Sequence, residues 1–417
     1  MKAALSVWWN GRVLGRLVLS EHGDMSFAYE AAWLADPHTR PISRSLPKRD
    51  ASFGRREARP FFAGLLPEDP GREVVARVLG LSPGNDVALL NALGGDVAGA
   101  LTFWPECETP PPNDSGPANE PLADDALVTL LDALPTHPFL AGRGGLRLAL
   151  AGAQTKLPVV LVDDRVALPG PGQPTTHILK PPIERFAATT ENEAFVMRLA
   201  AACGLDVADA QPRKIKERTY LLVTRYDREW QEHGCLQRLH QEDFCQALGI
   251  PPERKYAADD GPTFKSGFAL LRGAADDPAK ETRRLLDAAV FNLIVGNADA
   301  HGKNFALLHA SGATRLAPLY DLLCTVAYPQ LSAKPAMKMA GEGVPEDFNP
   351  RTWEKFARNC EMDPSFLRQR VRELADLVRQ HASATADRIA SENFDSEALA
   401  NFAGVVTARA KIVAIST

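Results

Sequence analysis

The chain has 417 residues, a length that predicts two or three domains of about 150 residues each. Its 47 Lys and Arg residues and 52 Asp and Glu residues give a formal net charge of -5, and 45% of its residues are hydrophobic. The apolar content excludes a disordered chain, and the charge excludes a protein that binds nucleic acid through bulk positive charge.

The cysteines and the N-terminal segment indicate the compartment. The six cysteines are scattered without a CxxC pair, which predicts reduced thiols and neither a zinc site nor a disulfide framework. The first residues lack the apolar core of a signal peptide, and no run approaches the roughly 18 apolar residues of a membrane-spanning helix. We therefore expect a cytoplasmic protein with no membrane span.

The first hundred residues predict a small α+β unit. Residues 6–19 alternate around Asn10-Gly11, a dipeptide typical of a two-residue hairpin turn because both positions tolerate positive φ. Residue spacing then predicts two helices and a strand, at 72–79, 86–93 and 100–104. The next stretch, 105–121, is rich in Pro, Asn, Asp, Ser and Gly and is typical of a linker.

The second region is rich in predicted strands, with one helix between them. Strands are expected at 157–162, 166–168, 177–179 and 220–224. An Asp-Asp turn joins the first two strands, and Lys180 ends the third. The helix is expected over 190–203, where Thr190 and Glu193 fit a capping box.

Beyond residue 228 the periodicity is mostly helical. Helices are expected over 285–294, 364–381 and 397–413. A β-rich lobe is therefore followed by a helical lobe. The predicted domains are an N-terminal subdomain (1–105), a linker (106–125), the β-rich lobe (126–228) and the helical lobe (229–417).

The segment GNADAHGKNF, residues 296–305, directly follows a predicted helix and is the most informative part of the sequence. Asp299 and Asn304 have the spacing of a protein-kinase catalytic loop, in which the Asp receives the proton of the substrate hydroxyl and the Asn holds Mg²⁺. Both residue types are needed, because phosphoryl transfer concentrates negative charge near the γ-phosphate. Taken alone, such a match also arises by chance in an ordinary helix-to-loop turn.

Four further residues have two interpretations each. Asp321 has apolar flanks, so it is either paired or metal-bound in a buried segment, or a helix N-cap or turn residue. Lys180 is a phosphate-binding lysine or a solvated strand end, and Glu193 is its partner or the capping-box residue. His301 is a metal ligand or, with no second His or Cys at ligand spacing, forms an orienting hydrogen bond. The order of these residues along the chain favours a kinase.

At this point the sequence resembles the HipA family, the serine/threonine-kinase toxins of bacterial HipBA toxin–antitoxin modules. The resemblance covers nearly the whole chain and implies an α+β, protein-kinase-like bilobal fold, with a β-rich N-lobe, an all-helical C-lobe and an added N-terminal α+β subdomain. The motifs that carry it are FFAGLLPEDPGRE (61–73), GGDVAGAL (94–101), LALAGAQTKLPVV (148–160), PTTHILKPP (174–182), NEAF (192–195), LLVTRYDR (221–228), HQEDFCQALG (240–249), KYAADDGPTF (255–264), GNADAHGKNF and PLYDLL (318–323).

The resemblance also implies roles in phosphate transfer. Asp299 would be the catalytic Asp, and Asn304 and Asp321 would hold Mg²⁺. Lys180 and Lys303 would lie near the phosphates of ATP.

For nucleotide binding, the resemblance implies a phosphate loop, a hinge and a histidine of the catalytic loop. At the hinge, Thr224 and Tyr226 would lie near adenine and Asp227 near the ribose. The segment 241–243 would line or support the same cleft. The residues are Ala151, Gly152, Ala153, Gln154 and Lys156 in the phosphate loop, Thr224, Tyr226 and Asp227 at the hinge, and His301. Within the phosphate loop only Gly152 permits an easy close backbone approach.

One position departs from the family pattern. HipA-like kinases usually carry a serine two residues before the AGAQ segment, and its autophosphorylation ejects the phosphate loop and inactivates the enzyme. This chain has Ala149 there, so that off-switch cannot operate at position 149. Either the natural protein lacks it, or the sequence is an engineered Ser→Ala form. Thr155 is an alternative phosphosite or a loop hydroxyl that contacts phosphate.

The resemblance implies an ATP- and Mg²⁺-dependent serine/threonine kinase that is the toxin of a type II toxin–antitoxin module. Its target would be a translation factor, especially an aminoacyl-tRNA synthetase such as glutamyl-tRNA synthetase, so that growth arrest and persistence follow. One alternative is a kinase-fold enzyme that acts on a small molecule or lipid. The other is a corepressor that binds a HipB-like helix-turn-helix antitoxin and, with a net charge of -5, reaches operator DNA mainly through it.

Overall fold

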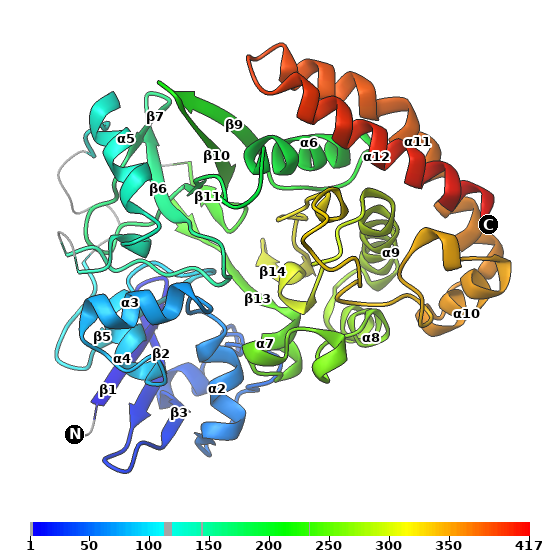
Figure 1. The fold of residues 1–417 in the computed structure, drawn as a ribbon. Helices are drawn as coiled ribbons and strands as arrows, with labels where there is room; N and C mark the ends of the chain where they lie inside the picture. The colour runs from blue at the N-terminus through cyan, green and yellow to red at the C-terminus, as the bar shows by residue number, and fades with distance from the viewer. Residues whose placement is uncertain (1–2, 112–118, 143–144, 233) are drawn as a thin grey trace. The chain divides into compact units, whose positions relative to one another are not determined.

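The computed structural model describes residues 3–111, 119–142, 145–232 and 234–417. Part of the predicted linker, residues 112–118, lies outside the described residues. The chain forms two compact units, whose elements are labelled in Figure 1. The first unit contains Met1–Pro181, Arg213–Glu253 and Leu308–Ala310, and the second contains Pro182–Pro212, Arg254–Leu307 and Ser311–Thr417.

The first unit begins with a five-stranded sheet in the order β4-β3-β2-β1-β5. The predicted hairpin is confirmed: Asn10 and Gly11 both have positive φ (46° and 78°), and β1 pairs antiparallel with β2. The elements are β1 (Ala3–Trp9), β2 (Arg12–Leu19), β3 (Met25–Tyr29), β4 (Phe53–Gly54), β5 (Leu101–Pro105), α1 (Ala31–Ala35), α2 (Arg55–Ala63), α3 (Gly71–Leu79) and α4 (Asp86–Leu93).

A second five-stranded sheet has the order β7-β6-β8-β10-β9. The predicted strands at 157–162, 166–168, 177–179 and 220–224 are confirmed to within two residues, whereas β9 was not predicted. The elements are α5 (Asp124–Ala133), β6 (Leu157–Val162), β7 (Arg165–Ala167), β8 (His177–Lys180), β9 (Ala210–Ile215), β10 (Arg218–Thr224), β11 (Arg228–Trp230), β12 (Leu236–Arg238), β13 (His240–Asp243) and α7 (Phe244–Leu248).

One continuous apolar core runs through the first unit. Val7 and Phe27 of the first sheet, Phe61 of α2, and Leu157 and Leu179 of the second sheet are fully buried members of this core. The first sheet therefore does not form its own separate core. It shares apolar packing with strands β6 and β8, which follow the proposed phosphate loop in the chain.

The second unit is mainly helical, as the periodicity predicts. Its elements are α6 (Thr189–Ala202), α8 (Phe264–Ala274), α9 (Pro278–Val295), β14 (Ala306–Ala310, whose last three residues belong to the first unit), β15 (Ala313–Leu316), α10 (Pro350–Cys360), α11 (Pro364–Ala390) and α12 (Ser396–Ile415). In Figure 1, α11 and α12 lie side by side as a long antiparallel pair. Among the described residues, α12 is long and apolar enough to cross a membrane by length and composition, but it buries Leu399, Phe402 and Val406 against other helices of the unit.

The predicted capping box of α6 is wrong. The helix begins at Thr189, one residue before the predicted start, and its N-cap is Ala188, which has no side chain that can cap. Thr190 is therefore inside the first turn, and its buried hydroxyl has no hydrogen-bond partner among the residues that the structure describes. Glu193 is buried and does not cap the helix, so the capping-box interpretation of this residue is wrong.

The helix α9 directly precedes the GNADAHGKNF segment in the chain. The Asp277 side chain accepts a hydrogen bond from the Lys280 backbone N–H at its start, and Pro278 occupies the first turn. At its end Gly296 has φ 71°, a left-handed conformation that turns the chain out of the helix. A Cβ at this glycine would meet Val326 Cγ2 at 2.3 Å, so only glycine fits here.

Candidate active site

The loop after Gly296 is fixed by buried polar contacts within the second unit. The Asn297 side-chain amide donates to Asn292 Oδ1 of α9 at 2.9 Å. The Ala298 backbone N–H donates to Thr325 Oγ1 at 2.8 Å. Because these groups hold the first residues of the loop in place, the following aspartate is presented from a defined backbone.

That aspartate, Asp299, is exposed to solvent, as a base that must reach an external hydroxyl requires. Its Oδ1 accepts a hydrogen bond from the Tyr256 hydroxyl at 3.0 Å. Sequence reasoning gave no role to Tyr256, although it lies in the KYAADDGPTF motif, because the tyrosine and the aspartate are far apart in the chain.

The structure brings Asn304 and Asp321 together. Asn304 Nδ2 donates to Asp321 Oδ2 at 3.1 Å, and Asn304 Oδ1 accepts from the His301 backbone N–H at 3.1 Å. Asp321 has φ 58° and is half-buried, so it is a turn residue that is also paired. An amide and a carboxylate at this distance supply the hard oxygen atoms that Mg²⁺ prefers. In this arrangement the amide nitrogen of Asn304 faces Asp321, so the groups that would hold Mg²⁺ are the Asp321 carboxylate and the second lone pair of Asn304 Oδ1.

The other polar residues of the loop have distinct surroundings. Lys303 is buried, and its backbone carbonyl accepts a hydrogen bond from the Tyr320 hydroxyl at 2.6 Å. His301 is buried with its ring edge-on to Tyr256, at a centroid distance of 5.3 Å. Within the described ranges there is no group of three or more His, Cys, Asp or Glu side chains that could hold a metal ion. The metal-ligand interpretation of His301 therefore gains no support. The orienting hydrogen bond at this position runs from the His301 backbone N–H to Asn304 Oδ1.

The proposed phosphate loop belongs to the first unit and is folded around its lysine. Lys156 Nζ donates to the Ala151 carbonyl at 2.6 Å. Gly152 has φ 105°, and its carbonyl accepts from the Glu68 backbone N–H at 3.3 Å. Pro67 and Gly152 form a parallel bridge, so the loop is anchored to the segment that follows α2. Ala153, Gln154 and Thr155 complete the loop.

We expect Gly152→Ala to weaken ATP binding by roughly tenfold or more. Position 152 has φ 105°, a conformation that strains alanine, and an added Cβ would also displace the Lys156 ammonium group, which lies 2.5 Å from the Cβ position. Titration of the variant with a fluorescent ATP analogue measures the change. Gly84→Ala is the matched control, because nothing lies closer than 3.8 Å to a Cβ there. Equal affinities for parent and Gly152→Ala would contradict a phosphate-binding role for the loop.

The remaining nucleotide candidates lie on or near the second sheet. Lys180 ends β8, is buried, and pairs in register with Leu221 of β10. Thr224 ends β10 and is half-buried. The Tyr226 hydroxyl donates to Gln241 Oε1, which ties this tyrosine to β13.

The position of the family serine is fully buried in this chain. Ala149 is 0% exposed, and its backbone N–H donates to the Asp96 carbonyl at 3.1 Å. The segment that leads into the phosphate loop is therefore held by the GGDVAGAL motif.

Asp227 has a different environment from the one expected of a ribose ligand. It is buried, and its carboxylate accepts from Arg225 Nε at 2.9 Å and from the Gly99 backbone N–H at 2.7 Å, and it forms an ion pair with Arg228 Nη1 at 3.0 Å. Although burial raises the pKa of the Asp227 carboxyl, the two arginines bring it below its usual range. The side chain is thus part of a buried ion cluster that also contains Asp96.

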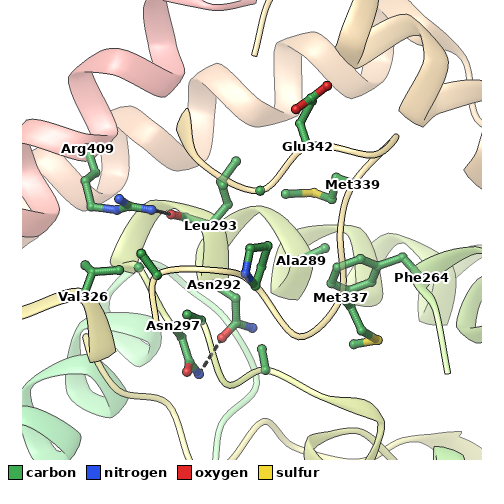
Figure 2. Close-up of a pocket in the computed structure, with 16 residues that line it drawn as sticks. Phe264, Ala289, Asn292, Leu293, Asn297, Val326, Met337, Met339, Glu342 and Arg409 are labelled. Atoms are coloured by element: carbon green, nitrogen blue, oxygen red, sulfur yellow. Dashed lines mark hydrogen bonds between the residues drawn. The ribbon is translucent and has the colours of Figure 1, made fainter. Parts of the chain in front are cut away.

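A pocket lies behind the catalytic loop in the second unit (Figure 2). Asn292 and Asn297 meet at one side of it, and Arg409 donates to the Leu293 carbonyl at 2.8 Å on another. Phe264, Met337 and Met339 supply much of its apolar lining. The side chains of the proposed transfer residues do not line it, so this pocket is not where phosphate transfer would occur.

An exposed aspartate five positions before an asparagine that pairs with a second aspartate is the arrangement of a protein-kinase catalytic loop. Family comparison agrees: the model of the HipA-like C-terminal domain matches residues 148–384, and that of the HipA N-terminal domain matches residues 5–104. The chain belongs to the HipA family and is a protein kinase with an α+β, kinase-like fold.

Relatives and a solved structure agree with this assignment. The chain is 53% identical to the putative kinase Y4mE of Sinorhizobium fredii over 99% of both sequences. It is 29% identical to the serine/threonine-protein kinase toxin HipA of Shewanella oneidensis, over 81% of this chain and 79% of the relative. The solved complex of Shewanella oneidensis HipA with HipB and its operator DNA matches with a TM-score of 0.84 and 26% identity, over 98% of this chain and 96% of the HipA chain.

Proposed function

We propose that the chain is an ATP- and Mg²⁺-dependent serine/threonine kinase and the toxin of a type II toxin–antitoxin module. The observation that carries this proposal is the hydrogen bond between Asp321 and Asn304, the latter on the same loop that exposes Asp299. These residues supply what phosphoryl transfer needs from a protein: metal ligands and a carboxylate acceptor near the γ-phosphate.

The chain's own side chains divide the work. Asp299 accepts the proton of the target hydroxyl as that oxygen attacks the γ-phosphate. Asn304 and Asp321 hold the Mg²⁺ ion, which neutralises the charge of the phosphates. Lys180, Lys303 and the loop around Gly152 bind phosphate oxygens. The hinge residues Thr224 and Tyr226 lie near adenine, and His301 supports the loop from within.

The target that we propose rests on the resemblance to the HipA family, and the antitoxin partner rests on one solved relative. The target is a translation factor, an aminoacyl-tRNA synthetase such as glutamyl-tRNA synthetase, in the cytoplasm. Because the Shewanella oneidensis relative was solved with HipB and operator DNA, we propose that this chain binds a HipB-like antitoxin. With a net charge of -5 it would reach DNA mainly through that antitoxin and act as a corepressor. Because Ala149 lacks a hydroxyl, the chain would have no phosphorylation switch at that position.

Labelled ATP added with this chain to a host lysate, followed by mapping of the phosphorylated sites, tests the proposal. We expect label on serine or threonine of one or a few proteins, and none with the Asp299→Asn variant. Free sugars and lipids are tested in parallel. Label only on a small molecule would overturn the assignment of a protein substrate, and label that persists with Asp299→Asn would overturn the site.

A further inference from the structure

The second unit holds Tyr256 against the proposed base. The Tyr256 hydroxyl donates to Asp299 Oδ1 at 3.0 Å, and the tyrosine is half-buried whereas the aspartate is exposed. An exposed aspartate side chain can ordinarily occupy several rotamers. A hydrogen bond from a fixed donor selects one of them, and a bond to a charged acceptor is stronger than a bond between neutral groups.

The backbone on both sides of the tyrosine is tied to the segments that flank the base. The Lys255 carbonyl accepts a hydrogen bond from the Gly302 N–H at 3.1 Å. The Ala257 N–H donates to the Ala336 carbonyl at 3.1 Å, and the Ala336 N–H in turn donates to the Ala298 carbonyl at 2.8 Å. These backbone hydrogen bonds therefore fix the position of Tyr256 relative to the loop residues before and after Asp299.

The ring of Tyr256 is fixed as well as its backbone. It packs edge-on to His301 with a centroid distance of 5.3 Å, and Lys255 Nζ lies 5.2 Å from its centroid. These two contacts restrict rotation of the ring and so fix the direction in which its hydroxyl points. The hydroxyl points to Asp299 Oδ1.

We propose that Tyr256 is a positioning residue for phosphoryl transfer: its hydroxyl fixes Asp299 through Oδ1, so that Oδ2 is presented to the target hydroxyl. This inference rests on the proposed function of Asp299 as the proton acceptor. The tyrosine keeps its own proton, because it donates to the carboxylate and takes no part in the proton transfer. The target's proton goes to the aspartate, and the γ-phosphate goes to the target oxygen.

The Tyr256→Phe variant isolates the hydroxyl, because phenylalanine keeps the ring and its packing. We expect kcat for protein phosphorylation to fall about ten- to hundredfold, the range that corresponds to one hydrogen bond to a charged group. KM for ATP should stay within about twofold of the parent, since the hydroxyl contacts the base and not the nucleotide. Tyr29→Phe is the control for loss of a tyrosine hydroxyl away from the site: in the first unit the Tyr29 hydroxyl donates to the Leu46 carbonyl and accepts from the Ile42 backbone N–H. We expect its kcat to equal that of the parent.

A double-mutant cycle separates positioning from a general structural role. In the Asp299→Asn background, Tyr256→Phe should change the residual rate less than twofold, because the hydroxyl acts through the carboxylate. Equal reductions in both backgrounds, or a kcat for Tyr256→Phe within twofold of the parent, would overturn the positioning role while leaving the proposed function intact. Transfer that is unaffected by Asp299→Asn would instead overturn the function of the base itself, and with it this inference.

Discussion

The Asp299→Asn variant is expected to lose protein phosphorylation by a factor of about 10²–10⁴, the usual contribution of a general base. Asparagine has nearly the same shape as aspartate, and its carbonyl oxygen still accepts a hydrogen bond from Tyr256. The amide cannot take up the proton of the target hydroxyl at neutral pH. The fold should be unchanged, because the native side chain is exposed and buries no charge.

Initial rates with labelled ATP, together with thermal unfolding of each variant, measure this effect. Asp321→Asn should also abolish transfer, and its defect should respond to Mg²⁺ concentration because it removes a carboxylate from the proposed metal pair. Asp376→Asn is the matched control, since it removes an exposed carboxylate of α11 that pairs only along its own helix with Arg379. A parental rate for either active-site variant would show that the site has been assigned incorrectly.

The local structure and the catalytic loop could be predicted from the sequence for specific physical reasons. The Asn10-Gly11 turn depends only on the φ preferences of two adjacent residues, and α9 depends on a single apolar periodicity. The resemblance to the HipA family implies that Asn304 and Asp321 act together, and their side chains are hydrogen-bonded to each other. In each case the signal lies within a short stretch of chain.

Features that depend on contacts between distant segments could not be predicted in the same way. The capping box of α6 failed because the helix begins one residue earlier, at Thr189, whose hydroxyl accepts a hydrogen bond from the Ile183 backbone N–H of the preceding segment. The hydrogen bond from Tyr256 to Asp299 cannot be predicted locally, since nothing in the sequence around either residue indicates that the two side chains meet. The resemblance implies that Asp227 lies near the ribose, and the local sequence does not indicate that its carboxylate accepts hydrogen bonds from Arg225 in the folded chain.

That ion cluster explains why several family motifs meet in the first unit. Asp96 comes from GGDVAGAL, and Arg225 and Arg228 come from LLVTRYDR. Asp96 Oδ2 lies 3.0 Å from Arg225 Nη1, and Asp96 Oδ1 lies 2.8 Å from Arg228 Nη2 and 3.0 Å from Arg238 Nε. Three buried arginines thus share two buried aspartates, and each guanidinium would be very costly without its partners. These two motifs therefore contribute buried ion pairs that stabilise the first unit, in addition to any role in nucleotide binding.

Asp96→Asn is therefore expected to destabilise the first unit by about 3–5 kcal/mol, the usual effect of removing one partner of a buried ion pair. Burial alone would raise the pKa of the Asp96 carboxyl, but Arg228, Arg225 and Arg238 hold it well below its usual range. Because this folded-state pKa is depressed, the stabilisation is complete above the unfolded-state pKa of about 4 and is lost as the pH falls below it.

Urea unfolding at several pH values, followed by circular dichroism, measures the effect of Asp96→Asn. The difference between parent and variant should be largest near neutral pH and should shrink as the pH falls below about 4. Asp132→Asn is the control, since it removes a fully exposed carboxylate that pairs with Arg218 at the surface, and its midpoint should match that of the parent. Parental stability of Asp96→Asn at neutral pH would mean that the arginines are satisfied without this carboxylate. A pH-independent loss would mean that the asparagine disturbs packing, with no contribution from the missing charge.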